Sequence, residues 1–493
     1  MKEHLMTDST IPHHHTSQIF VGGTWRAPTG DRRIEVENPA TGEIVADIPE
    51  AGPEDAATSV ALAAEAFDKG VWSGLDVTER GKVLTRVADL LDEHRDQFIE
   101  YVVRDLGSAR AFAAFVHDIS IDIWRDYARR GDEVALETVE TGPDGRTVLL
   151  RKEPVGTVLA VVPWNGPIVL ASLKLAPALL AGCSVVMKPA PETPLAPLLL
   201  ADILAEAGVP EGVVSILPGG RELGEALQAQ PGLDMVSFTG GTEAGKAVMG
   251  VAAKNLQRMT LELGGKSAAI VLDDVEPVDV MPALAAGMLG GSGQVCTALT
   301  RVLVSKERHD VWRDALKDLF ESQVIGDPDD EATTYGPLAS QAQMTRVLAR
   351  IQDAEDDGGV IVTGGEALDR PGYFIAPTLV DGVTTNMRVA QEEVFGPVFA
   401  LMVYEDVEDA IRIANDSQFG LSGAVMTHDI AAGVEIGRRI RTGTFSVNGF
   451  GAHMSFPFGG YKQSGMGREG GAAGLDSFLE IKQIALPAGA QLA

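Results

Sequence analysis

The sequence is poor in cysteine and in positive charge. Only Cys183 and Cys296 among its 493 residues are cysteines, so at most one disulfide can form, and a chain of this size needs none. We therefore expect a reducing, cytoplasmic location. The chain has 40 Lys and Arg residues and 70 Asp and Glu residues, which gives a formal net charge of −30. This balance argues against a nucleic-acid partner, because Lys and Arg supply most of the affinity for a phosphate backbone.

Long hydrophobic runs are also missing. The longest, at 175–187, contains Pro177 and falls short of the roughly 20 residues that a membrane helix needs. Residues 1–20 are polar and contain no apolar stretch of signal-peptide length. We expect no membrane partner. The histidine triplet His13, His14 and His15 has a composition that can bind metal, but a flexible tail without a metal is the expected interpretation.

Strand and helix patterns alternate along the first half of the chain. Apolar, β-rich runs occur at 155–163, 184–188, 213–217, 235–238 and 258–263. Helical patterns occupy 54–70, 77–105, 169–181, 197–207, 221–229 and 242–254. Strands that are apolar throughout and alternate with helices are typical of a parallel, doubly wound sheet, which binds ligands at the carboxyl ends of its strands.

A second strand–helix series, from about 267 to 447, predicts a second α/β domain with the site in the cleft between the two. Residues 134–154 predict two strands joined by a Pro-Asp-Gly turn. The edge of an exposed hairpin invites pairing, so an oligomer contact is one interpretation and a surface flap is an equally good one.

Cys296 is the first candidate for chemistry. It follows Gly290, Gly291 and Gly293, and residues without a Cβ let a backbone approach a ligand closely. A thiolate in such a setting is a strong nucleophile if nearby charges lower its pKa. A lone intracellular cysteine is more often a small buried residue, and Cys183, inside an apolar run, keeps that interpretation.

Two further polar residues follow predicted strands. Glu262 ends an apolar strand just before Gly264, where a carboxylate points into the crevice of a parallel sheet. Asn165 follows the strand at 155–163, where its amide can donate to a developing oxyanion. Taken alone, each also fits an ordinary strand-end or turn residue.

The chain contains one G-x-G-x-x-G pattern, at Gly465, Gly467 and Gly470. No predicted strand precedes it and too little chain follows for a βαβ unit, so we reject it as a dinucleotide fingerprint. The segment 237–248 is the better candidate, because it runs from strand through a glycine-rich turn into a helix whose free N–H groups suit a pyrophosphate. Lys188, which ends another strand, can hold ribose hydroxyls or phosphate.

Taken together, these segments resemble the aldehyde dehydrogenase superfamily. The matching segments appear in the family's order: PWNGP, KPAPETP, FTGGTEAG, LELGGK, GQVCTA, GYFIAPTL, EEVFGP and PFGGYKQSGMGRE. Cys296 follows Glu262 by 34 positions, which is also the family's spacing. The resemblance extends from about residue 18 to 486.

The resemblance implies a hydrolytic, NAD(P)-dependent oxidation of an aldehyde. Cys296 then forms a thiohemiacetal, Asn165 and the backbone N–H of Cys296 hold its oxyanion, and Glu262 activates water against the thioester. Lys174 and Glu469 match positions implicated in proton relay. The implied cofactor contacts are Val162, Pro163, Trp164, Lys188, Gly219, Gly240, Gly241, Thr242, Gly245, Leu263, Gly264, Glu393 and Phe395. No metal ligands are implied.

The resemblance also implies three structural parts. Residues 1–130 and 154–263 would form a Rossmann-like cofactor domain, and 264–463 the catalytic domain. Residues 131–153 and 464–493, with a C-terminal strand at 478–486, would form an oligomerisation element in a homodimer or homotetramer.

Three departures from the family pattern bear on specificity. Pro191 stands where many NAD-preferring relatives carry a ribose-binding Glu, so NADP stays open beside NAD as cofactor. Gly241 replaces a common Ser and loses a hydroxyl donor. Gly166 replaces a common aromatic residue, which opens space near the substrate entrance or loosens the turn.

Two alternative functions stay open at this point. A CoA-acylating semialdehyde dehydrogenase would release the thioester to CoA, and Glu262 argues against it because such members typically lack that carboxylate. A catalytically silent structural or binding protein on the same scaffold is the other. Retention of Cys296, Glu262 and Asn165 together argues against that one.

The substrate is predicted less sharply than the reaction. Aromatic walls would favour apolar or aromatic aldehydes, although core packing explains each of the residues concerned equally well. No anion-binding Arg is evident near Cys296, since Arg301 has an equally good structural interpretation. The candidate pocket residues are Phe112, Phe115, Trp124, Val295, Thr297, Phe450 and Phe456.

Overall fold

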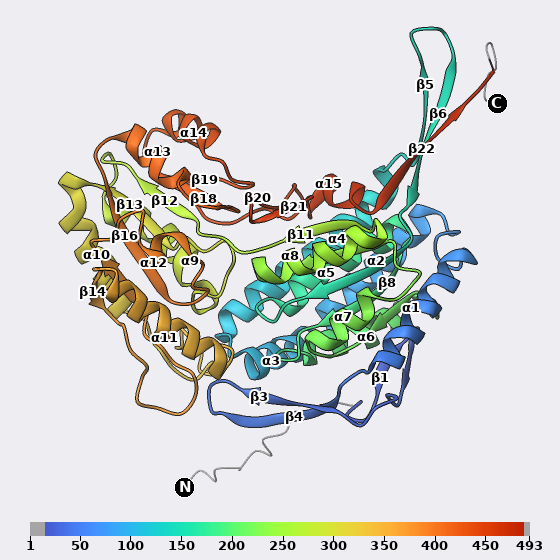
Figure 1. Ribbon diagram of the computed structural model, residues 1–493, viewed down its shortest axis with the longest axis horizontal. Helices are drawn as coiled ribbons and strands as arrows, with labels where there is room; N and C mark the ends of the chain where they lie inside the picture. The colour runs from blue at the N-terminus through green and yellow to red at the C-terminus, as the bar shows by residue number, and fades with distance from the viewer. Residues whose placement is uncertain (1–14, 488–493) are drawn as a thin grey trace.

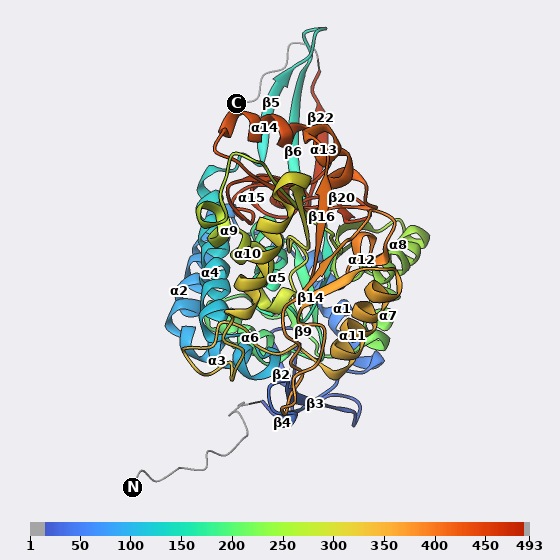
Figure 2. The same cartoon turned by 90° about the vertical axis from the view of Figure 1, so that its left-hand side faces the viewer.

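The computed structural model describes residues 15–487. Figure 1 shows two α/β lobes beside each other, with a thin arm of strands projecting from one of them. Figure 2 shows the arm and the hairpin of β3 (Arg33–Asn38) and β4 (Glu43–Pro49) at opposite ends of the molecule. The mixed α/β architecture with parallel sheets confirms the predicted fold class.

The first lobe is built on an eight-stranded sheet. Its strands are β1 (Ile19–Val21), β2 (Thr24–Arg26), β7 (Thr157–Val162), β8 (Ser184–Pro189), β9 (Val214–Ile216), β10 (Met235–Thr239), β11 (Arg258–Glu262) and β21 (Gly465–Met466). They lie in the order β2-β1-β9-β8-β7-β10-β11-β21, and the five strands from β9 to β11 are parallel. The chain builds outward from β7 to β9 and then returns to β10. The strand order therefore reverses between β7 and β10, and a doubly wound sheet binds its ligand at such a switch point.

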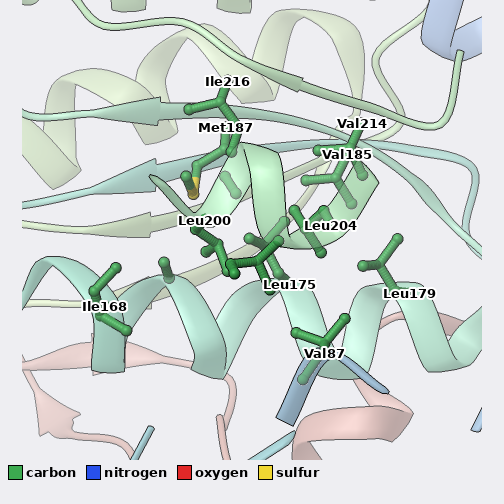
Figure 3. Close-up of a cluster of buried hydrophobic side chains, with 14 of the residues drawn as sticks. Val87, Ile168, Leu175, Leu179, Val185, Met187, Leu200, Leu204, Val214 and Ile216 are labelled. Atoms are coloured by element: carbon green, nitrogen blue, oxygen red, sulfur yellow. The ribbon is translucent and has the colours of Figure 1, made fainter. Parts of the chain in front are cut away.

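Helices cover both faces of this sheet because successive strand residues point to opposite sides. Val158 and Ala160 face a core made with α2 to α6, whereas Leu159 faces a second core made with α1 and α7. In Figure 3, Met187 and Ile216 of the sheet lie over apolar side chains of α5 and α6. The helices are α1 (Pro53–Asp68), α2 (Val77–Glu93), α3 (Arg95–Leu106), α4 (Arg110–Glu133), α5 (Pro167–Ala181), α6 (Leu195–Glu206), α7 (Arg221–Gln228) and α8 (Thr242–Asn255).

The second lobe has a seven-stranded sheet that is parallel except at one edge. Its strands are β12 (Ala268–Val271), β13 (Arg301–Ser305), β14 (Val360–Thr363), β15 (Thr378–Asp381), β16 (Val398–Tyr404), β18 (Gly423–Met426) and β19 (Ser446–Val447). Their order is β14-β15-β16-β13-β12-β18-β19. One face packs against α9 (Pro277–Leu289) and α10 (His309–Glu321), and the other against α11 (Gln341–Asp356), α12 (Arg388–Gln391), α13 (Val407–Asn415) and α14 (Ile430–Arg439).

The arm is a three-stranded antiparallel sheet in the order β22-β6-β5. It joins the predicted hairpin, β5 (Glu137–Thr141) and β6 (Thr147–Pro154), to the C-terminal strand β22 (Leu479–Ala485). Two short elements connect the arm to the second lobe: a ladder of β17 (Phe419–Gly420) with β20 (Tyr461–Lys462), and the helix α15 (Gly471–Asp476).

The sequence pattern missed two helical features. The single helix predicted at 77–105 is wrong, because it is interrupted at His94, which lies between the end of α2 and the start of α3. No Gly or Pro marks that break. The 24-residue helix α4 was not predicted. None of the helices between residues 15 and 487 is long and apolar enough to span a bilayer.

The predicted N-terminal tail is partly ordered. His13 and His14 lie outside the described residues, whereas the His15 ring stacks on Trp25 with centroids 3.8 Å apart. Residues 15–487 contain no cluster of three or more His, Cys, Asp or Glu side chains arranged to hold a metal ion.

Candidate active site

The loop before Cys296 has an unusual backbone. Gly291, Ser292 and Gly293 have φ angles of 55°, 57° and 73°, a left-handed conformation that costs a non-glycine residue energy. The Ser292 hydroxyl donates to the carbonyl of Gly336 at 2.9 Å and holds this turn. A Cβ at Gly293 would lie 2.6 Å from the carbonyl oxygen of Gly396. The glycines therefore let this loop pack tightly where it leads to Cys296.

Asn165 joins this loop to the first lobe. It follows β7, beside the switch point, and its Nδ2 donates to the carbonyl of Gln294 at 3.0 Å. Gln294 in turn donates to Gly291 and accepts from the backbone N–H of Ala339. The predicted amide and the predicted thiol are thus brought to the same place from different lobes.

The segment Gly264–Gly265 passes directly over the nucleophile loop. A Cβ at Gly265 would clash with the carbonyl oxygen of Cys296, and a Cβ at Gly264 would clash with the carboxylate of Glu393. The N–H of Gly265 donates to Glu393 Oε1 at 3.0 Å. Only glycines permit this approach, which gathers Cys296 and Glu393 beside the end of β11.

Glu262 ends β11 and is 3% exposed. Neither of its carboxylate oxygens has a hydrogen-bond partner of standard geometry among the described residues, although the backbone N–H of Gly460 lies close enough to lower its pKa. Burial, together with the charge of Glu469, raises its pKa well above the usual value, and Lys174 and Arg468 oppose that shift. A raised pKa makes a carboxylate more basic, which suits a general base.

The thiol of Cys296 is protonated at neutral pH in this arrangement. Burial, followed by the charges of Glu393 and Glu262, raises its pKa to about 12, although the residue as a whole is partly exposed. Burial likewise raises the pKa of Glu393, to about 7. A cation brought into the cleft would lower the thiol pKa by offsetting these carboxylates.

Lys174 and Glu469 form an ion pair in the interior, behind Glu262. Lys174 Nζ lies 2.6 Å from Glu469 Oε1, and both side chains are at most 1% exposed. Lys174 also donates to the hydroxyl of Ser237 at 3.0 Å, and Thr260 donates to the same hydroxyl at 2.9 Å. These polar groups continue from Glu262 into the first lobe.

The turn between β10 and α8 fits a pyrophosphate. Gly241 is the N-cap residue of α8, and it has no side chain that could accept a hydrogen bond from the first N–H groups of the helix. These N–H groups are therefore available to a ligand. The buried hydroxyls of Thr239 and Thr242 on either side have no partner among the described residues. Gly240 donates its N–H to the carbonyl of Glu262 at 3.0 Å, and a Cβ at Gly245 would lie 2.5 Å from Leu263. The turn is thereby fixed against the end of β11.

Lys188 lies near the end of β8, at the same carboxyl edge of the first sheet as the turn between β10 and α8. Its Nζ donates to the carbonyls of Gly219 and Pro189 at 2.8 and 3.1 Å, and burial lowers its pKa to about 8. The charges of Glu192 and Glu50 oppose that shift. Glu50 also accepts from the N–H of Gly220 at 3.2 Å. Sequence reasoning missed Glu50, which follows β4 and belongs to no motif.

Two aromatic residues, Trp164 and Phe395, pack against each other close to Glu393. Trp164, which follows Val162 and Pro163 at the end of β7, meets Phe395 edge-on with ring centroids 5.3 Å apart. Phe395 has a φ of 56°, and its carbonyl accepts from Gln343 at 2.6 Å. This strained residue therefore stays fixed next to Glu393.

Five of the seven predicted pocket residues lie beside the nucleophile loop in the sequence or structure, or on the surface. Val295 and Thr297 flank Cys296, and Phe115 and Phe456 are 59% and 65% exposed. Phe112 packs on the nucleophile loop, 3.0 Å from where a Cβ of Gly290 would lie. The same ring borders a cavity of about 190 Å³ that is lined also by Gly290, Gly291 and Ser292 of that loop.

Trp124 and Phe450 are placed differently. Trp124 is a correction: its indole is fully buried between α4 and α5 and donates to Ser172, so it belongs to the core and not to a pocket wall. Phe450 packs against the core under α9. Arg301 is structural, because its guanidinium donates to three backbone carbonyls, those of Lys266, Ile413 and Ala414.

Comparison with known proteins agrees with this geometry. The model of the aldehyde dehydrogenase family matches residues 25–484. The geranial dehydrogenase of Castellaniella defragrans is 39% identical over 97% of this chain and 99% of its own length. The structure of a Mycobacterium tuberculosis aldehyde dehydrogenase complexed with NAD+ superimposes with a TM-score of 0.94 at 41% identity, covering 97% of this chain and 99% of that one.

A third similar protein was solved with an aldehyde bound. Aldehyde dehydrogenase C of Pseudomonas syringae, solved as a variant with NAD+ and octanal, superimposes with a TM-score of 0.94 at 35% identity and covers 98% of this chain and 99% of that one. The chain therefore belongs to the aldehyde dehydrogenase family, and it oxidises aldehydes with NAD(P)+.

Proposed function

We propose that Cys296 is the nucleophile and Glu262 the base of a hydrolytic aldehyde oxidation. The deprotonated Cys296 sulfur attacks the aldehyde carbon, and its oxyanion accepts hydrogen bonds from Asn165 Nδ2 and from the backbone N–H of Cys296. NAD(P)+, when bound, accepts the hydride that leaves this carbon. Glu262 then takes a proton from a water molecule, whose oxygen attacks the resulting thioester. The carboxylic acid leaves and the Cys296 sulfur is restored.

The observation that carries this proposal is the state of Glu262. It is a buried carboxylate whose oxygens form no hydrogen bond of standard geometry among the described residues, its pKa is raised, and its charge acts on the Cys296 thiol. A buried carboxylate without a partner is costly to the fold, which favours a role in the reaction over a structural one. The same carboxylate favours water over CoA as the acceptor of the acyl group.

The remaining site residues have supporting roles in this proposal. Lys174 and Glu469 pass protons between Glu262 and the interior. Glu393 and Phe395 hold the nicotinamide end of the cofactor, and Lys188 the adenosine ribose. The other contacts to the cofactor come from Val162, Pro163, Trp164, Gly219, Gly240, Gly241, Thr242, Gly245, Leu263 and Gly264.

Apolar aldehydes are the proposed substrates. Of the three similar proteins described above, one is named a geranial dehydrogenase and another was solved with octanal, and both compounds are apolar aldehydes. Phe115 and Phe456 are exposed aromatic side chains in this chain, and Phe112 packs beside the nucleophile loop. Apolar walls select apolar ligands through buried area.

The division of the chain and its assembly also belong to this proposal. Residues 1–130 and 154–263 bind the cofactor, 264–463 carry the nucleophile, and 131–153 with 464–493 make the contact between copies in a cytoplasmic homodimer or homotetramer. The projecting arm supports this, because an unpaired strand edge is costly unless another chain covers it.

The proposed function is tested with purified protein, NAD+ and octanal, by following the absorbance of the reduced cofactor and identifying the product. We expect octanoic acid without added CoA, and no activity from Cys296→Ala. Octanoyl-CoA formed only when CoA is present would support the acylating alternative. A Cys296→Ala variant that keeps full activity would refute the assignment of the nucleophile.

A further inference from the structure

A cluster of basic side chains surrounds a small cavity in the second lobe. The cavity lies where β12 and β18 begin and is small: the centre of a water-sized occupant has about 10 Å³ in which to lie, so only a single small molecule or ion fits. Lys266 and Arg301 line its inner end and Arg441 its exposed end. Lys462 lies close enough for Arg441 and Arg301 to lower its pKa, after the larger effect of burial.

Lys266 stands out in this cluster. It is 2% exposed, and its Nζ has no hydrogen-bond partner among residues 15–487. A buried ammonium without a hydrogen-bond partner destabilises the folded chain. Burial and the charge of Arg301 lower its pKa to about 7, whereas Glu393 and Glu392 oppose that shift.

The four basic side chains of the cluster also form no direct ion pair within the described chain, and Glu393, Glu392 and Asp416 act on them only from farther away. Within the described chain, no carboxylate oxygen lies within 4 Å of a side-chain nitrogen of Lys266, Arg301, Arg441 or Lys462; no such ion pair is found, although acidic residues outnumber basic ones by 70 to 40. Asp416 raises the pKa of Arg301 from a greater distance. Arg301 and Lys462 donate hydrogen bonds to backbone carbonyls, which carry no net charge and so do not neutralise the side chains.

We propose that this cavity is a binding site for a small monovalent inorganic anion, such as chloride. The anion would accept a hydrogen bond from Lys266 Nζ and offset the charges of Arg301 and Arg441. A water molecule would satisfy the hydrogen bond but not the charge, which is why an anion is the better occupant.

The site has a place in the architecture of the enzyme. Lys266 directly follows Gly264–Gly265, the segment that packs on Cys296 and donates to Glu393. An anion that keeps Lys266 protonated would fix the end of that segment. This role is separate from the chemistry proposed for Cys296 and Glu262 and does not depend on it.

Crystals grown or soaked in sodium bromide test the proposal, because bromide substitutes for chloride and is located by its anomalous scattering. We expect a peak next to Lys266 Nζ in the unmodified protein and in the control Arg438→Gln. The control removes an exposed positive charge that is already paired with Glu435. The peak should be absent from Lys266→Met. No peak in the unmodified protein, or a carboxylate of a neighbouring subunit inside the cavity, would overturn the proposal.

A solution measurement separates a real site from an adventitious ion only. Thermal unfolding is followed in sodium chloride and in sodium gluconate at equal ionic strength. The melting temperature should rise with chloride in the unmodified protein and in Arg438→Gln, because a ligand that binds only the folded state stabilises it. The rise should shrink in Arg441→Gln, which also serves if Lys266→Met does not fold. Equal melting temperatures in both salts for the unmodified protein would mean an adventitious ion only and would overturn the proposal.

Discussion

The thiol of Cys296 and the carboxylate of Glu262 are linked electrostatically: burial, Glu393 and Glu262, in that order, raise the thiol pKa to about 12. The nucleophile is therefore protonated at neutral pH, mainly because it is buried and further because of the two carboxylates. The nicotinamide ring of NAD+ is positively charged, so its arrival in the cleft would lower the thiol pKa.

This link predicts how alkylation of Cys296 depends on pH. Because only the thiolate reacts, iodoacetamide should label the protein slowly at neutral pH and faster as the pH rises. Glu262→Gln should react faster than the unmodified protein at alkaline pH, since it lacks the opposing charge. Cys183, fully buried with a pKa also raised to about 12, should stay unlabelled. Equal rates for the two proteins at every pH would contradict the link.

Asn165 gives a second prediction. Asn165→Ala removes the oxyanion donor and should lower kcat by about 10²–10³-fold, as loss of one such donor does in other enzymes. Steady-state rates with octanal check it. Asn415→Ala is a control, because Asn415 also donates to a backbone carbonyl, that of Arg439, but far along the chain from the site. An unchanged kcat in Asn165→Ala would exclude this role.

The buried pair of Lys174 and Glu469 gives a prediction about stability. Lys174→Met leaves a buried carboxylate without its partner and should reduce the free energy of unfolding by about 3–5 kcal/mol. The double variant Lys174→Met, Glu469→Gln should lose less, because neither charge remains. Urea unfolding of both variants measures this. A double variant less stable than Lys174→Met would show that the pair is not coupled in this way.

Glu50 leads to a prediction about the cofactor. Its carboxylate lies near Lys188 and the start of α7, on the edge proposed to bind the adenosine ribose. A negative charge there repels the 2′-phosphate of NADP, so Glu50→Gln should raise the kcat/KM ratio of NADP to NAD. The exposed Glu54 offers the control Glu54→Gln, which should leave the ratio unchanged. An unchanged ratio in Glu50→Gln would show that Glu50 does not act on specificity.

The sequence predicted the parts of the fold whose patterns are local. Apolar strands such as 155–163 follow from an uninterrupted β-rich run, and the structure confirms them with boundaries shifted by one or two residues. The break at His94 was not predictable, because helical spacing continues through it and tertiary packing decides where the chain bends. The same limit explains Trp124, since an aromatic residue on a helix face gives no sign of whether core or pocket covers it.

In the candidate site too, residues inside local motifs were predictable and residues placed by tertiary packing were not. Motifs identified Cys296 and Glu262 because they stand beside glycines that the backbone approach requires. Glu50 and Lys266 gave no such signal. Glu50 lies near Lys188 only because β4 ends beside the first sheet. Lys266 is unusual only because the fold buries its ammonium without a hydrogen-bond partner among the described residues.

The most direct test of the account is the pre-steady-state kinetics of Glu262→Gln with NAD+ and octanal. The thioester forms without Glu262 but waits for an activated water. We therefore expect a rapid burst of reduced cofactor, close to one equivalent per active site, followed by turnover slowed by orders of magnitude. A variant that turns over at the normal rate without a burst would contradict the role of Glu262 as the base that completes the reaction at Cys296.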